Sequence, residues 1–252
     1  MSANAPLTTG SSLCADEKKA LSLLKHTVTQ LESEAITLDE LSRFNAHQSP
    51  FENTSRPYSK QIEGFQKYFQ DRWNFKCGDA EMGGLYVPRP RGYCKTLLIL
   101  PPAKVIAGMD DICAKWRSEK KFSVWTFADG ALNEKVRNDR RHLGMYALLH
   151  KGERDADEEL RNRSFEQNRE DGLLVQIART EETMRATEVL LFEDFYFLKT
   201  GEHLDPRTAT ITSSLDSDGY AVFVRWADDV DVGQYVVQNA DPSWASRAAV
   251  YL

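Results

Sequence analysis

Residues 220–238 read YAVFVRWADDVDVGQYVVQ, and this stretch decides the fold. Its side chains alternate with the period of a strand, which predicts two β-strands over residues 220–226 and 230–238. Asp228 and Asp229 stand between them as a turn. The positions expected to point inward are Tyr220, Val222, Val224, Trp226, Val230, Val232 and Val236. The stretch therefore predicts a hairpin with one face in the core.

The segments on either side extend this hairpin into a sheet. A strand is expected over residues 209–213, and after a turn at residues 239–243 a last strand over residues 245–251 closes an antiparallel sheet. Before them, residues 179–199 form the most apolar helix pattern of the chain, which we expect to lie buried against the sheet. Gly201 follows where a left-handed C-cap is expected.

The middle of the chain alternates strands with a helix. Strands are expected over residues 85–87, 95–100, 122–127 and 143–149, and an amphipathic helix near residues 105–116. This order suggests a small α/β layer, with the helix covering one face of a sheet.

Two charged segments of this middle part are expected on the surface. Residues 152–172 carry mixed charges that include Asp155, Asp157, Glu158 and Glu159, and nothing in the pattern predicts their burial. A basic cluster is interpreted as a solvated turn; it consists of Arg137, Arg140, Arg141 and His142.

The N-terminal part is predicted to be helical. Helices are expected over residues 15–34, near residues 37–44 and over residues 59–73, each with one apolar face. Residues 1–75 then form a small helical region, followed by an α+β domain over residues 76–252. The helices either pack on one another or dock a partner, which would make the protein a homo- or hetero-oligomer.

Composition and charge narrow the class of function. The formal net charge is −6, which argues against nucleic acid as a partner. No stretch has the length and hydrophobicity of a membrane span or a secretory signal, so we expect a cytoplasmic protein without membrane insertion. The cysteines are Cys14, Cys77, Cys94 and Cys113.

These cysteines are too far apart in the sequence for a metal knuckle or a redox dithiol, and reduced core thiols are expected. His203 is interpreted as a structural group. We expect no metal and no cofactor.

Three segments carry a resemblance to a known family. Residues 199–205 (KTGEHLD), 217–220 (SDGY) and 246–250 (SRAAV) resemble a widespread family of bacterial proteins similar to the variable proteins of diversity-generating retroelements. Residues 146–148 and 156–160 are similar to it as well, so the resemblance spans roughly residues 97–252. The chain departs from the family's pattern at residues 210–215, and at Ala245, where the family has an arginine.

The resemblance implies a fold and a kind of function. The C-terminal part is expected to have a C-type-lectin-type (formylglycine-generating-enzyme-like) fold that displays side chains for ligand binding. The outward positions and turns of the last hairpins would form this face: Phe223, Arg225, Asp228, Asp231, Tyr235, Gln238, Asn239, Asp241 and Trp244. Aromatic residues and arginine are typical of binding surfaces.

We therefore expect a non-enzymatic protein that binds another protein or a small ligand. One alternative is a structural or assembly component of a multi-subunit particle. Another is a relative of the formylglycine-forming oxidases. Their chemistry needs cysteines or copper late in the chain, whereas every cysteine here precedes residue 114.

Overall fold

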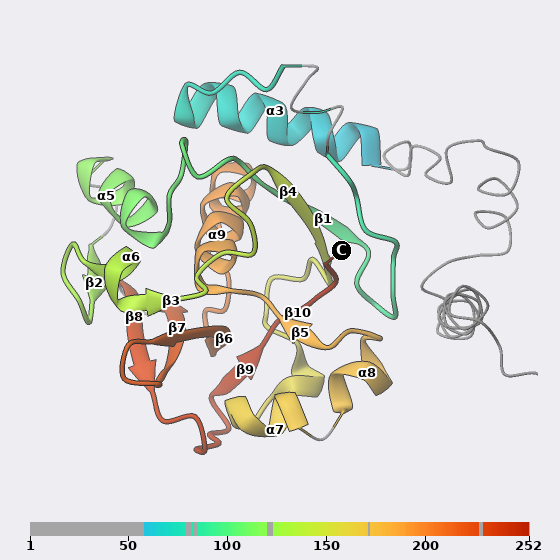
Figure 1. Ribbon diagram of the computed structural model, residues 1–252, viewed down its shortest axis with the longest axis vertical. Helices are drawn as coiled ribbons and strands as arrows, with labels where there is room; N and C mark the ends of the chain where they lie inside the picture. The colour runs from blue at the N-terminus through green and yellow to red at the C-terminus, as the bar shows by residue number, and fades with distance from the viewer. Residues whose placement is uncertain are drawn as a thin grey trace, which may run out of the picture. The chain divides into compact units, whose positions relative to one another are not determined.

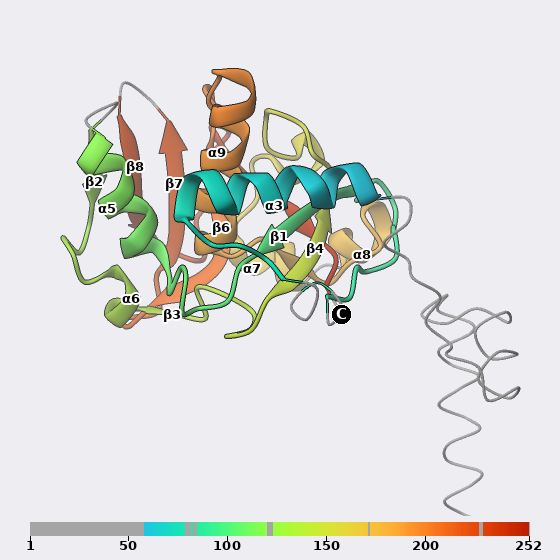
Figure 2. The same cartoon turned by 90° about the horizontal axis from the view of Figure 1, so that it is seen from above.

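The computed structural model describes residues 58–78, 82, 85–119, 123–170, 172–226 and 229–251. All of them belong to one compact unit, Thr54–Leu252. The helices predicted over residues 15–34 and 37–44 lie outside the described residues. The described part is a mixed α+β structure (Figures 1 and 2).

A six-stranded sheet forms the centre of this unit. Its strands run in the order β2-β8-β7-β6-β3, and β9 pairs with β6 beside β3. Their bounds are β2 Val124–Thr126, β3 Val136–Arg137, β6 Ala209–Asp216, β7 Ala221–Trp226, β8 Val230–Tyr235 and β9 Trp244–Ser246. The predicted hairpin is confirmed as β7 and β8, which pair antiparallel from Ala221 opposite Tyr235 to Trp226 opposite Val230.

The prediction of a purely antiparallel sheet closed by residues 245–251 is wrong. β9 pairs with β6 in parallel, and β2 pairs with β8 in parallel. Both sides of β8 are occupied, by β7 and β2, so the chain after β8 crosses the sheet to reach the free side of β6. The next residues form β10, Ala248–Ala249, which pairs antiparallel with β5, Glu182–Thr183.

Helices cover the inner face of the sheet (Figure 2). α9, Ala186–Thr200, packs on β6 and β7, and α5, Met109–Glu119, packs against α9 and β2. The ring of Trp116 on α5 lies 6.1 Å from that of Trp226 on β7. The inward valines of β7 and β8 are almost fully buried here, as the alternation predicted. The prediction was wrong for Tyr220 and Val236, which lie just outside the two strands and are 39% and 38% exposed.

α3, Ser59–Trp73, crosses the outer side of α9 (Figures 1 and 2). The rings of Phe65 and Phe195 stack at 4.1 Å. The buried carboxylate of Asp194 on α9 accepts hydrogen bonds from Tyr68 Oη at 2.5 Å and Trp116 Nε1 at 2.6 Å, and it pairs with Arg72. This carboxylate joins α3, α5 and α9, so the helix expected in the N-terminal region belongs to the same compact unit as the sheet.

A second, smaller sheet lies beneath α3. β1, Thr96–Leu100, pairs antiparallel with β4, Tyr146–His150. The expected α/β layer is therefore wrong, because its strands separate: β1 pairs with β4, whereas β2 joins the large sheet. The strand predicted at residues 85–87 is also absent, since residues 85–90 have no regular structure. The short helices are α6 Leu132–Lys135, η2 Glu158–Leu160, α7 Phe165–Glu170 and α8 Leu173–Ile177.

The apolar helix is confirmed, with a later start than predicted. α9 begins at Ala186 rather than near residue 179, because Glu182 and Thr183 form β5 against β10. Glu188 caps it by accepting the backbone N–H of Arg185 at 2.7 Å. The helix ends at Gly201 with a φ of 75°, the left-handed C-cap that the sequence predicted.

Two of the expected surface charges are buried. Asp157, 1% exposed, accepts hydrogen bonds from the backbone N–H of Ala248 at 2.7 Å and from Tyr93 Oη at 2.9 Å. Arg140, 8% exposed, donates to the carbonyls of Pro101 and Ile106. These groups fasten loops to the core, because each satisfies backbone groups that would otherwise lack partners.

Candidate functional site

One row of side chains crosses the outer face of the large sheet. The strand registers place Trp244 opposite Ala209, Ala209 opposite Arg225, Arg225 opposite Asp231, and Asp231 opposite Trp125. Directly paired residues point to the same side of a sheet. These five positions, on β9, β6, β7, β8 and β2, therefore share the face that lies away from α9.

Three aromatic side chains form a cluster beside this row. The ring of Trp244 lies 3.7 Å from that of Tyr235 and 4.8 Å from that of Phe223. Phe223 lies over Gly233, where an added Cβ would stand 2.3 Å from the ring. The glycine therefore lets the phenylalanine lie flat across β8 and brings β7, β8 and β9 into one aromatic surface.

The exposed part of the face lies toward β8 and β2. Trp125 is 58% exposed, and the Arg225 side chain is 51% exposed. Arg225 donates to Asp231 Oδ2 at 2.6 Å, which holds the guanidinium across two strands. At the opposite end α7 covers β9, because Asn168 Nδ2 donates to Ser246 Oγ at 3.0 Å. We call Trp125, Phe223, Arg225, Tyr235 and Trp244 the outer face.

The turn after β8 holds the other predicted site residues. Asp241 Oδ1 accepts the backbone N–H of Ser243 at 2.8 Å, so its carboxylate shapes the turn. The Ser243 hydroxyl donates to the same oxygen at 2.5 Å, and this bond together with the backbone bond lowers the pKa of Asp241. Gln238 donates to Glu166 on α7 at 2.9 Å, and Asn239 is exposed. Asp228 lies outside the described residues.

The structure thus brings most of the predicted residues together and adds one. Phe223, Tyr235 and Trp244 form one cluster, in which Phe223 is only 9% exposed, and the Arg225–Asp231 pair shares their face. Trp125 was missed, because it reaches this face through a parallel pairing with a strand about a hundred residues later. No local pattern signals such a pairing.

A histidine–carboxylate pair lies at the end of α9. His203 Nδ1 lies 2.8 Å from Glu193 Oε1, and its ring stacks between Phe197 at 4.4 Å and Trp226 at 3.6 Å. Glu193 Oε2 also accepts the backbone N–H of Leu204 at 2.7 Å. Burial raises the pKa of Glu193, which the hydrogen bond from His203 partly offsets. The pair fastens the loop after α9, in keeping with the structural role predicted for His203.

Two of the three described cysteines have their thiols in the core, and the third, Cys77, is half-buried. Cys94 and Cys113 are buried, and desolvation raises the pKa of each to about 12. Such thiols are poor nucleophiles, because the reactive form is the thiolate. Among the described residues, no group of three or more His, Cys, Asp or Glu side chains is arranged to hold a metal ion.

None of the helices in the described part of the chain combines the length and hydrophobicity needed to cross a membrane. Comparison of the chain with protein-family models, curated proteins and solved structures gives no significant match.

Proposed function

We propose that this chain is a non-enzymatic binding protein and that the outer face is its recognition surface. The observation that carries the proposal is the combination of an exposed tryptophan and an exposed arginine with a stacked aromatic cluster on one rigid sheet. Tryptophan, tyrosine and arginine dominate the energetics of binding surfaces. Because strands hold these side chains in place, little conformational entropy is lost when a partner binds.

The proposal includes the finer fold assignment. Its C-terminal part would be of C-type-lectin type, similar to the variable proteins of diversity-generating retroelements. Two segments of that resemblance meet in the core: Asp205, from residues 199–205, forms a buried ion pair with Arg247, from residues 246–250, at 2.7 Å. A contact between these segments supports their being parts of one structural motif.

The observations favour binding over the two alternatives. An oxidase of the formylglycine-forming kind needs a reactive thiol or copper, whereas Cys94 and Cys113 are buried with raised pKa values. An assembly role through the N-terminal region concerns residues 1–75. Of its helices, α3 packs on α9 through Phe65 and Phe195, and those expected over residues 15–34 and 37–44 lie outside the described residues. The outer face is the candidate that the described residues support by their own geometry.

Site-specific photo-crosslinking tests the proposal. A photoreactive amino acid is placed at position 125 or 225 of the full chain, and at position 143 as a control. Leu143 is apolar and 79% exposed, but it lies outside the large sheet. We expect the same partner to be crosslinked from positions 125 and 225 and not from 143. Equal yields from all three positions, or no product from the outer face, would refute the assignment.

A further inference from the structure

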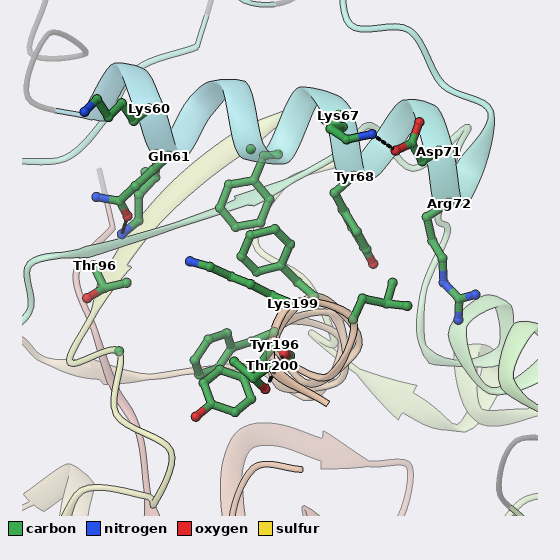
Figure 3. Close-up of a pocket in the computed structure, with 17 residues that line it drawn as sticks. Lys60, Gln61, Lys67, Tyr68, Asp71, Arg72, Thr96, Tyr196, Lys199 and Thr200 are labelled. Atoms are coloured by element: carbon green, nitrogen blue, oxygen red, sulfur yellow. Dashed lines mark hydrogen bonds and ion pairs between the residues drawn. The ribbon is translucent and has the colours of Figure 1, made fainter. Parts of the chain in front are cut away.

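A groove between α3 and α9 forms a concave site on the opposite side of α9 from the sheet (Figure 3). Its volume is about 830 Å³, within the range of small-molecule sites, roughly 300–1,000 Å³. It is lined by α3, the C-terminal half of α9, the start of β1 and Gly152. Nothing in the proposed function uses this groove.

The floor of the groove is aromatic and aliphatic. Phe65 from α3 stacks on Phe195 from α9, and Phe192 and Leu198 continue the apolar lining. Leu198 is 44% exposed, although the periodicity of α9 placed it on the buried side. An exposed leucine beside two stacked rings leaves apolar surface in contact with water, and an apolar ligand would cover it.

The charges around the groove are unbalanced. Lys67 pairs with Asp71, and Arg72 pairs with Asp194 and Glu119. Within the described part of the chain Lys60 and Lys199 are in no ion pair. Lys199 lies over the ring of Phe195, with Nζ 6.0 Å from its centroid, and Figure 3 shows its amine extending across the cavity toward the side of Gln61 and Thr96.

The C-terminus of α9 does not cancel this positive charge. The last carbonyls of a helix carry a partial negative charge that would repel an anion. Here the Thr200 hydroxyl donates to the carbonyl of Tyr196 at 2.8 Å, and the backbone N–H of Gly201 donates to that of Phe197 at 2.8 Å. Of the last four carbonyls, that of Phe197 is therefore satisfied within the helix, and the full positive charge of Lys199 exceeds the roughly half elementary charge of the helix end.

We propose that the groove binds a free long-chain carboxylate, with its tail on the Phe65, Phe195 and Leu198 surface and its carboxylate on Lys199. The apolar floor suits a hydrocarbon tail, and the ammonium groups of Lys199 and Lys60 give the lining the positive charge that an anionic head group needs. Tyr196 also lines the groove, and its hydroxyl is a further donor for a carboxylate.

Calorimetric titration of the full chain with dodecanoate, below its micellar concentration, tests this proposal. We expect saturable binding at one site. Lys199→Glu should weaken it by about tenfold or more, because a charge-assisted hydrogen bond becomes a repulsion. Lys199→Met, which removes only the charge, should have a smaller effect in the same direction. Lys104→Glu changes an exposed lysine outside the groove and should leave the affinity unchanged.

Three further ligands distinguish the contribution of the head group to affinity from that of the tail. Dodecanol should bind wild type and Lys199→Glu equally, since it has no charge. Dodecylammonium should bind Lys199→Glu more tightly than wild type. Octanoate is four methylenes shorter than dodecanoate and should bind up to about 250-fold more weakly, because each buried methylene contributes roughly fourfold in affinity.

The proposal is overturned by any of three results. These are absence of saturable dodecanoate binding, equal affinities of Lys199→Glu and Lys104→Glu for dodecanoate, and association only with anionic phospholipid vesicles without binding of the monomer. Thermal unfolding of each variant shows that the fold is retained.

Discussion

Two arginine–aspartate ion pairs with nearly equal N–O distances should differ several-fold in how much they contribute to the free energy of unfolding. Arg247 and Asp205 lie 2.7 Å apart with side chains 1% and 4% exposed. Arg225 and Asp231 lie 2.6 Å apart with side chains 51% and 18% exposed. Distance alone would rank the two pairs equally, so burial is the main difference between them. Asp205 also has a left-handed φ of 50°, which alanine adopts less readily than aspartate or asparagine.

The expected magnitudes follow from what each substitution leaves behind. Asp205→Ala leaves the buried Arg247 guanidinium with only the carbonyls of Glu153 and Arg154 as acceptors, and removal of one member of a buried pair costs about 3–5 kcal/mol. It also removes the acceptor of the Thr210 hydroxyl. Asp231→Ala leaves an arginine that water solvates, and an exposed pair contributes about 0.2–1 kcal/mol.

Urea unfolding at pH 7, followed by tryptophan fluorescence, measures both losses in the free energy of unfolding. In about 1 M salt the effect of Asp231→Ala should shrink and that of Asp205→Ala should persist, because salt screens only the exposed pair. If Asp205→Ala is too unstable to measure, Asp205→Asn retains an acceptor oxygen and should give a smaller loss. Equal losses for the two sites, or less than about 1 kcal/mol for Asp205→Ala, would refute the reasoning.

Three other predictions concern single sites. Gly233→Ala places a Cβ against the Phe223 ring and should lower the free energy of unfolding by about 1–3 kcal/mol. Adding Phe223→Leu to this variant should restore part of the loss. An unchanged urea midpoint for Gly233→Ala alone would contradict the packing. Burial and, to a lesser extent, the charge of Arg247 lower the pKa of His150 from 6.5 to about 3. Between these two pH values the unfolded chain binds a proton at His150 that the folded chain does not, so the free energy of unfolding falls as the pH falls through this interval. His150→Asn keeps an acceptor for the Gly152 N–H and should flatten the stability profile there by up to about 1.4 kcal/mol per pH unit; parallel profiles for the two proteins would disprove the buried neutral state. At pH 8 a thiol reagent should leave Cys94 and Cys113 unmodified in the native protein and modify both after unfolding, as peptide mass mapping would show; rapid native modification of either would contradict their burial.

The parts of the fold that follow from local pattern were predictable. Alternation between Tyr220 and Tyr235 identifies β7 and β8, and the apolar periodicity before Gly201 identifies α9. These signals work because a strand or helix with one buried face must repeat its apolar residues with its own period. The ends of these elements were predicted less accurately, since β5, which delays the start of α9, and the turn after Tyr235 depend on partners elsewhere in the chain.

The parts that depend on long-range pairing were not predictable. The place of β9 depends on which side of β6 is free, and Trp125 joins the outer face only through β8. The burial of charged residues could not be predicted for a related reason. In the sequence, Asp157, Arg140 and Asp205 look like surface residues. Their partners are backbone groups or an arginine about forty to ninety residues away.

An affinity measurement tests most directly whether the outer face is the recognition surface. The partner identified by crosslinking is purified and titrated with wild type, Trp125→Ala, and Tyr235→Ala combined with Trp244→Ala. The control is Leu143→Ala. We predict a loss of affinity of about tenfold or more for each outer-face variant, with secondary structure retained by circular dichroism and wild-type affinity for the control. Wild-type affinity in both outer-face variants would contradict the central claim.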